Sequence, residues 1–211
     1  MTTTSAGPVV LRGGIVVEDP LDVVLGFLSR WRLDLSDPAQ PTSFGEPDLR
    51  LANRGGARIS AAEIAAILQR RDAIERALEA IAPGASLSAS PCGEADPVPW
   101  LPLRQLFDAF AGIRGVGFAK MTKALHPKRP ALVPMLDSIV QKYLRDDDPG
   151  ARAPFGQRAL ALVRGYQTEL DRNLSAVRAV RRELVGHGYE VTEVRILDLL
   201  ILSAAAAGRA T

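Results

Sequence analysis

Apolar residues recur at helical spacing along most of this 211-residue chain, and this pattern restricts the fold more than any other feature. The clearest example runs from Ile64 to Ile81 and ends before Pro83-Gly84. Ser60 and Glu63 precede it with the spacing of a capping box, in which each residue hydrogen-bonds the backbone of the other. A last, strongly apolar helix is predicted over Val191 to Ala206. We therefore expect an all-α fold, a helical bundle of about seven or eight helices.

The order of these patterns predicts one helical domain over residues 1–211. An N-terminal subregion covers 9–83, where the first residues have the character of a short strand or an ordered arm. A linker rich in Ser, Pro and Gly follows over 84–99. Two helices around a hairpin form a core over 100–145, and further helices are predicted over 155–207.

Composition excludes several classes of function. Cys92 is the only cysteine, so we expect no internal disulfide framework and no metal or cofactor site built on cysteines. The most apolar run, Ile196 to Ala207, contains Asp198 and is too short to span a membrane. Met1 to Pro8 lacks the basic and apolar regions of a signal peptide. We expect a cytoplasmic protein without metal or cofactor, and the sequence leaves its oligomeric state open.

The segment Gly115-Val116-Gly117 predicts a tight hairpin between two helices. Glycine adopts backbone conformations that a β-carbon disfavours, and it leaves neighbouring amides uncovered. The second helix starts immediately after the hairpin, so its free N–H groups and positive dipole end face outward. Such a turn can hold a phosphate oxygen without side chains.

Charge gathers around the same hairpin. The segment from Gly112 to Arg145 has seven basic residues and one acid, Asp137, which gives it a net charge of +6 against +2 for the whole chain. This local excess is what a phosphate-binding site needs. The predicted nucleic-acid-binding residues are Arg114, Gly115, Val116, Gly117, Phe118, Lys120, Lys123, Lys128 and Arg129.

Three features of this segment also have structural interpretations. The hairpin also suits a plain packing corner between helices with a solvated basic face. Lys128 and Arg129 also suit a helix end, where cations interact with the last carbonyls. Asp137 precedes Ser138 at the start of a predicted helix, so it is a good N-cap as well as a candidate catalytic carboxylate.

The hairpin between apolar helices resembles the helix-hairpin-helix motif of DNA repair proteins. Together with Pro130, Pro134 and Asp137-Ser138-Ile139-Val140, the stretch from Leu106 to Leu144 resembles the helix-hairpin-helix DNA glycosylases. This resemblance implies that the hairpin grips a DNA backbone and that Asp137 assists base excision. Ala119 stands where lyase-type members have a lysine, so lyase activity is not expected.

The whole chain also resembles a family of uncharacterised bacterial proteins with a Lys-Arg-Pro…Leu-Asp-Ser signature, found here at Lys128-Arg129-Pro130 and Leu136-Asp137-Ser138. No activity is implied by that resemblance. The function expected from the sequence is binding of the duplex DNA backbone without strong sequence preference. The alternatives are a monofunctional glycosylase-like enzyme that uses Asp137 and a non-catalytic protein-interaction module.

Overall fold

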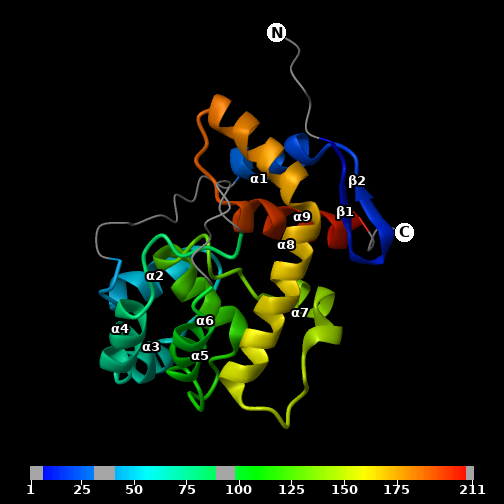
Figure 1. Cartoon of the computed structure of the whole chain (residues 1–211). Coiled ribbons are helices and arrows are strands. Elements are labelled where there is room, and N and C mark those ends of the chain that lie inside the picture. Colours follow the sequence, from blue (N-terminus) through cyan, green and yellow to red (C-terminus); the bar gives the residue numbers. More distant parts are fainter. Residues whose placement is uncertain (1–6, 31–40, 89–97, 208–211) are drawn as a thin grey trace.

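The computed structural model describes residues 7–30, 41–88 and 98–207, and these residues form a mostly helical fold (Figure 1). Over these ranges it contains nine α-helices, three short 3-10 turns and one two-stranded sheet. The all-α helical bundle predicted from the periodicity is confirmed. The structure has more helices than predicted, because residues 41–81 contain one helix that was not predicted and one predicted helix that is divided in two.

The N-terminal residues form a β-hairpin. Strands β1 (Val9–Leu11) and β2 (Ile15–Val17) pair antiparallel on either side of the 3-10 turn η1 (Arg12–Gly14). Helix α1 (Pro20–Arg30) follows, and it begins with a proline, a residue favoured at the first helical position. The N-terminal segment expected to be a short strand or an ordered arm is therefore a two-stranded hairpin.

Three short helices form the next region: α2 (Glu46–Arg54), α3 (Ala61–Leu68) and α4 (Arg71–Glu79). The sequence pattern did not predict α2. The single helix expected from Ile64 to Ile81 is divided at Gln69–Arg70, which lets α3 and α4 direct their buried residues into the core separately. The predicted capping box is present at the start of α3.

The remaining elements surround one long helix. Helix α8 (Phe155–Gly186) runs through the middle of the molecule and packs against α1, α5, α9 and β1 (Figure 1). The other elements are α5 (Trp100–Asp108), α6 (Phe118–Leu125), η2 (His126–Lys128), α7 (Ser138–Tyr143), η3 (Arg145–Asp147) and α9 (Glu193–Ala207). The core is largely aliphatic, as the low aromatic content requires.

Part of the predicted linker packs into the domain. Leu87 is buried, its amide donates to the Ala131 carbonyl at 2.9 Å, and its carbonyl accepts from Gln167 at 3.0 Å. The rest of that linker, 89–97 with Cys92, lies outside the described residues. None of the described helices combines the length and apolarity needed to cross a membrane.

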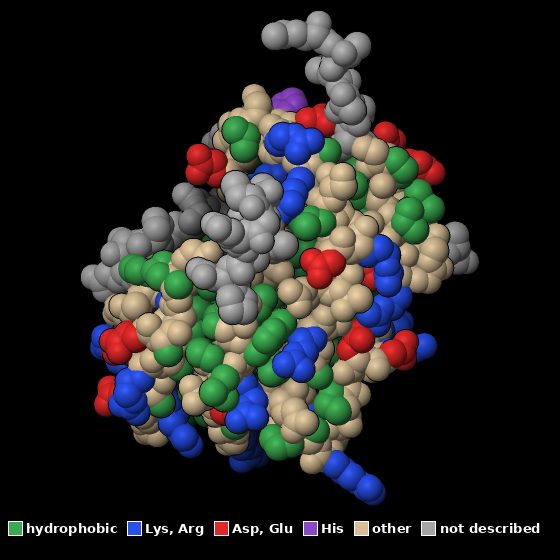
Figure 2. Space-filling view, in the orientation of Figure 1, with side chains coloured by type: hydrophobic (Ala, Val, Ile, Leu, Met, Phe, Trp, Pro, Cys, Tyr) green, Lys and Arg blue, Asp and Glu red, His purple; other side chains and the backbone are tan. Residues whose placement is uncertain are grey.

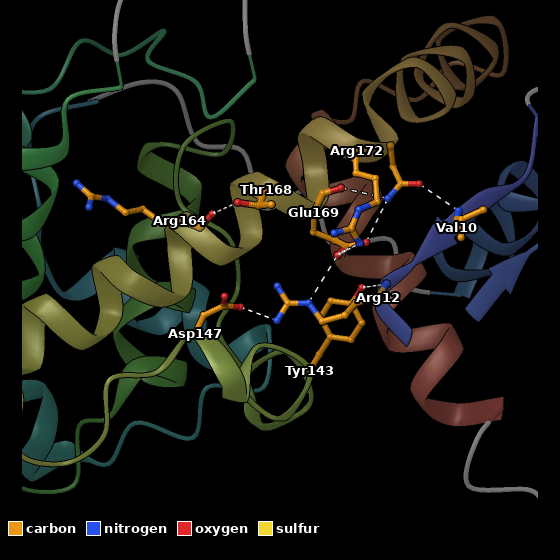
Figure 3. A network of polar contacts seen from close by, with 9 residues as sticks. Val10, Arg12, Tyr143, Asp147, Arg164, Thr168, Glu169 and Arg172 are labelled. Carbon is orange, nitrogen blue, oxygen red and sulfur yellow. Dashed lines mark hydrogen bonds and ion pairs between the residues drawn. The ribbon is translucent and has the colours of Figure 1, made fainter. Parts of the chain in front are cut away.

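A buried polar network fastens the β-hairpin to α8 (Figure 3). Glu169 on α8 is fully buried, and the Arg12 guanidinium lies between it, at 3.9 Å, and Asp147, at 2.7 Å. The Arg12 amide also donates to the Tyr143 hydroxyl at 2.7 Å. A buried carboxylate without a cation is strongly unfavourable. Arg12, with Arg172 at 3.1 Å, therefore makes the buried Glu169 tolerable.

We expect Arg12→Ala to lower the free energy of unfolding by about 2 kcal/mol, because it leaves the charge of Glu169 poorly compensated. Chemical denaturation of the variant and the wild type measures the difference. Adding Glu169→Gln should recover part of the loss, and Arg152→Ala, in an exposed turn, is the matched control. Equal losses for Arg12→Ala and Arg152→Ala would contradict this role.

Candidate nucleic-acid interface

The hairpin between α5 and α6 turns where the sequence places its glycines. Gly115 has a φ of +82°, a left-handed conformation that favours glycine. The Val116 amide donates to the Ile113 carbonyl at 3.1 Å, which closes the turn. Helix α6 then begins at Phe118, and its N-cap residue, Gly117, has no side chain to accept from the first free amides. The turn thus presents uncovered amides at the start of α6.

Apolar side chains anchor this hairpin to the domain. Val116 and Phe118 are both buried, and the Phe118 ring centroid lies 4.8 Å from that of Phe155. The Arg158 guanidinium also lies over the Phe118 ring, 5.3 Å from its centroid. These two predicted binding residues therefore hold the turn in place, and only their backbone is available to a ligand.

Glu63 is a residue at this hairpin that the sequence did not identify. Its carboxylate oxygens lie 2.6 and 2.7 Å from the Lys120 Nζ, and a β-carbon at Gly115 would collide with the same carboxylate. The bond from Lys120, followed by the Ser60 amide, lowers the pKa of Glu63. The charge of Lys120 is thus balanced on the Gly115 side. On the other side, a β-carbon built at Gly117 would meet no atom within 4 Å among the described residues, its chain neighbours aside.

Basic side chains lie on the hairpin and on the turn that α6 contacts. The Lys123 Nζ donates to the two carbonyls of Gly55–Gly56, at 3.2 and 3.3 Å, and so ties α6 to the end of α2. Arg54 and Arg58 flank this turn and are exposed, as is Arg114 on the hairpin itself. Within the described ranges, none of these three arginines pairs with an acid. Their charges are therefore available to a ligand.

We call Arg54, Arg58, Arg114, Gly117 and Lys123 the hairpin face. Figure 2 shows Lys and Arg side chains spread along the lower part of the molecule, where α2 to α6 lie, with some acidic side chains between them. An open groove of about 820 Å³ adjoins this face between α2 and α3. Its lining comprises Glu46, Arg50, Asn53, Arg54, Ala61, Ile64, Ala65 and Leu68.

Two predicted phosphate ligands are used inside the domain. Lys128 is buried and its Nζ lies 2.7 Å from the Asp48 carboxylate. Arg129 is fully buried and donates to four backbone carbonyls, those of Pro41, Lys128, Leu78 and Ile81, at 2.6–2.7 Å. Both side chains therefore join the segments around η2 to α2 and α4, a role closer to the structural alternative than to phosphate binding.

Asp137 occupies the cap position that its sequence context predicted. Its Oδ1 accepts from the amides of Ile139 and Val140, at 2.9 and 3.0 Å, which starts α7. Its Oδ2 accepts no hydrogen bond from the described part of the chain. The carboxylate is half-buried, so capping leaves one oxygen free for another role.

The four residues before Asp137, Val133–Leu136, are buried and belong to no helix or strand. Side chains therefore replace the missing backbone partners. The His126 Nδ1 lies 2.7 Å from the Val133 carbonyl, and the Leu136 amide donates to the Thr122 Oγ1 at 3.0 Å. Because Thr122 is on α6, this second bond links the Asp137 segment directly to the hairpin helix.

Asp198 on α9 supplies a third bond to this segment. Its Oδ2 accepts from the Met135 amide at 3.3 Å, while its Oδ1 is buried without a partner in the described ranges. Burial raises the pKa of Asp198 to about 7, and repulsion from Asp137 adds to the shift. The charge of Arg195 and polar contacts with Met135 and Tyr166 oppose it. Asp198 is therefore an acid that changes its charge near neutral pH inside the core.

Among the site residues that the sequence analysis did not identify, only Asp198 has a sequence context that could have indicated a functional role. It interrupts an otherwise apolar helix, and a charge in such a position is uncommon unless it is paired or functional. Glu63 was explained by its capping box, and Thr122 has no distinguishing context. Among the described residues, no three His, Cys, Asp or Glu side chains gather as a metal site would require.

A family model described as a family of unknown function (DUF6308) matches residues 31–205. The match covers most of the chain, which therefore belongs to this family. The β-hairpin and α1 precede the matched region. Comparison with curated proteins found no match, and comparison with solved structures found none either.

The raised pKa of Asp198 predicts a specific pH dependence of stability. Between pH 4 and 7 the folded protein keeps a proton on Asp198 that the unfolded chain has lost, so this group reduces stability as pH rises. His126 acts in the opposite direction, because burial lowers its pKa to about 4. The informative quantity is therefore the difference between the wild type and Asp198→Asn.

We expect Asp198→Asn to be the more stable protein at pH 8, by about 1–2 kcal/mol, and the difference to shrink toward pH 4. Denaturation curves at several pH values measure it, with Asp72→Asn, at an exposed position, as control. A difference that stays constant with pH would show that Asp198 does not titrate in this range.

Proposed function

We propose that this DUF6308 protein binds the phosphate backbone of duplex DNA at the hairpin face, without strong sequence preference. The observation that carries the proposal is the uncapped N-terminus of α6 together with three exposed arginines that have no acidic partner among the described residues. Arg114 lies on the hairpin itself, and Arg54 and Arg58 flank the Gly55–Gly56 turn that Lys123 of α6 contacts. Phosphate oxygens are the ligands that such amides and guanidinium groups bind in common. The groups of the hairpin face are complementary to a row of phosphates.

The contacts available on this face favour backbone binding over base reading. Amides at the hairpin and long cationic side chains bind phosphates of any sequence. Val116 and Phe118, which flank Gly117, are buried and cannot reach a base edge without unpacking. Lys123 is held at the end of α2 by two carbonyls, so its charge adds to the local potential with a fixed position.

The proposal predicts a salt dependence that identifies the arginines involved. Arg58→Ala combined with Arg114→Ala should weaken binding to a duplex and reduce the slope of log K against log salt concentration by about 2, because two phosphate contacts are lost. Fluorescence anisotropy at several salt concentrations measures the slope. Arg152→Ala combined with Arg182→Ala removes the same charge from exposed positions elsewhere and should change the slope much less.

A glycine substitution tests the backbone part of the same proposal. Gly117→Ala meets no atom within 4 Å and requires no left-handed backbone, so folding should be unaffected. A phosphate oxygen held against the hairpin amides would meet the added methyl group. We expect weaker binding with an almost unchanged salt slope. No binding by the wild type at low salt would refute the DNA proposal and favour a protein-interaction module.

A glycosylase-like activity of Asp137 is the second candidate. It is favoured by the free Oδ2 and by the bond from the Leu136 amide to Thr122, which fixes Asp137 relative to α6. In such a reaction the bond between the base and C1′ breaks, and a water oxygen bonds to C1′. The carboxylate stabilises the developing positive charge on the sugar or accepts the proton of that water, and the base leaves with the bonding electron pair.

Asp137→Asn separates this activity from the capping role. Asparagine caps helices about as well as aspartate, so stability should fall by no more than about 0.5 kcal/mol. Base release from a panel of damaged-base duplexes should fall at least about 100-fold, because the carboxylate charge is lost. Asp72→Asn controls for the charge change. Identical product traces for the wild type and Asp137→Asn would exclude Asp137 as a catalytic residue.

A further inference from the structure

Three buried side chains from three different elements hold the one segment that leads to Asp137. They are Thr122 on α6, His126 on η2 and Asp198 on α9, and we call them the polar clamp. His126 contacts the Val133 carbonyl at 2.7 Å, Thr122 accepts from the Leu136 amide at 3.0 Å, and Asp198 accepts from the Met135 amide at 3.3 Å. Polar groups are costly to bury, so three converging on four residues indicate that the position of this segment matters.

Asp198 is a poor choice if its only task is to accept one hydrogen bond. A neutral amide could accept the Met135 amide equally well, and it would not carry an acid into the core. The Asp198 Oδ1 has no hydrogen-bond partner among the residues that the structure describes, although it is fully buried. A buried polar atom left unsatisfied calls for an explanation beyond stability.

Charged and polar groups from several elements interact with the Asp198 carboxyl group. Tyr166 faces it from α8 and Arg195 from its own helix, while Asp137 interacts with it from the start of α7. The charge of Arg195 also contributes to lowering the pKa of His126, on η2. Of these groups, Asp137 is the carboxylate with an unbonded oxygen, and it follows Met135 by two residues. The Asp137 amide also donates to the Met135 carbonyl at 2.8 Å.

We infer that Asp198 is a positioning residue for Asp137, which it orients through the backbone of Met135. This inference rests on the proposal that Asp137 is a functional carboxylate. When Asp198 is ionised, its charge and its unsatisfied Oδ1 act on the segment that presents Asp137.

The test follows the Asp137 carboxyl carbon by NMR during a pH titration, and it needs no nucleic acid. In the wild type the signal should show an inflection near pH 7 as Asp198 ionises. In Asp198→Asn this inflection should disappear, while the amide signals of Ile139 and Val140 stay in place. A curve of the same shape in both proteins would overturn the link between Asp198 and the segment that presents Asp137.

A second variant tests whether Asp198 orients Asp137, because it removes the acceptor of the Met135 amide as well as the charge. In Asp198→Leu, the Met135 amide loses its partner, and we expect its hydrogen exchange to accelerate at least about 10-fold and the Ile139 and Val140 amide signals to shift. Asp198→Asn should restore wild-type exchange, which a loss of packing alone would not explain. Unchanged exchange and cap signals in Asp198→Leu would overturn the positioning role.

Thr122→Val is a second variant in case Asp198→Leu does not fold. It keeps the volume of the side chain and removes the acceptor of the Leu136 amide on the opposite side of the same segment. The Ile139 and Val140 signals should shift while the inflection near pH 7 persists, because Asp198 keeps its charge. These outcomes are independent of DNA binding, so loss of binding in the hairpin variants leaves them unaffected.

Discussion

The constraint on which this structure depends is the need to pair the backbone of a buried segment that has neither helix nor strand partners. Residues 133–136 cross the core, and every backbone polar group left alone there would cost about as much as a lost hydrogen bond. Thr122, His126 and Asp198 replace the missing partners. In doing so they join α6, η2 and α9 around the segment that ends at Asp137.

The same arrangement links the two parts of the candidate site. Thr122 lies one turn after the hairpin on α6, and its hydroxyl accepts from the Leu136 amide. The hairpin face and the Asp137 carboxylate are therefore fixed to one helix, so a ligand held by the hairpin amides would lie in a defined relation to Asp137. Glu63 balances the charge of Lys120, and its carboxylate lies against the Gly115 side of the hairpin. The Gly117 side stays open to an anion.

The sequence predicted local features well where one residue type has one strong preference. Ser60 and Glu63 form their capping box, and Asp137 caps α7. The sequence predicted less well which charged side chains are exposed and which are buried in ion pairs. Lys128 contributes to the +6 of its segment, yet it is buried against Asp48, a residue 80 positions away. Local charge counts cannot include such partners, because they are brought close only by folding.

The sequence by itself determined the helical class, the tight glycine turn and the capping of α7, because each follows from backbone preferences that act within a few residues. Only the tertiary structure decided which cations remain available and which acids are buried. Arg114 is exposed and unpaired, whereas Arg129 serves four carbonyls inside the core. Asp198 becomes an acid that titrates near neutral pH because the surrounding helices exclude water from it, and solvent exclusion is a property of the assembled fold.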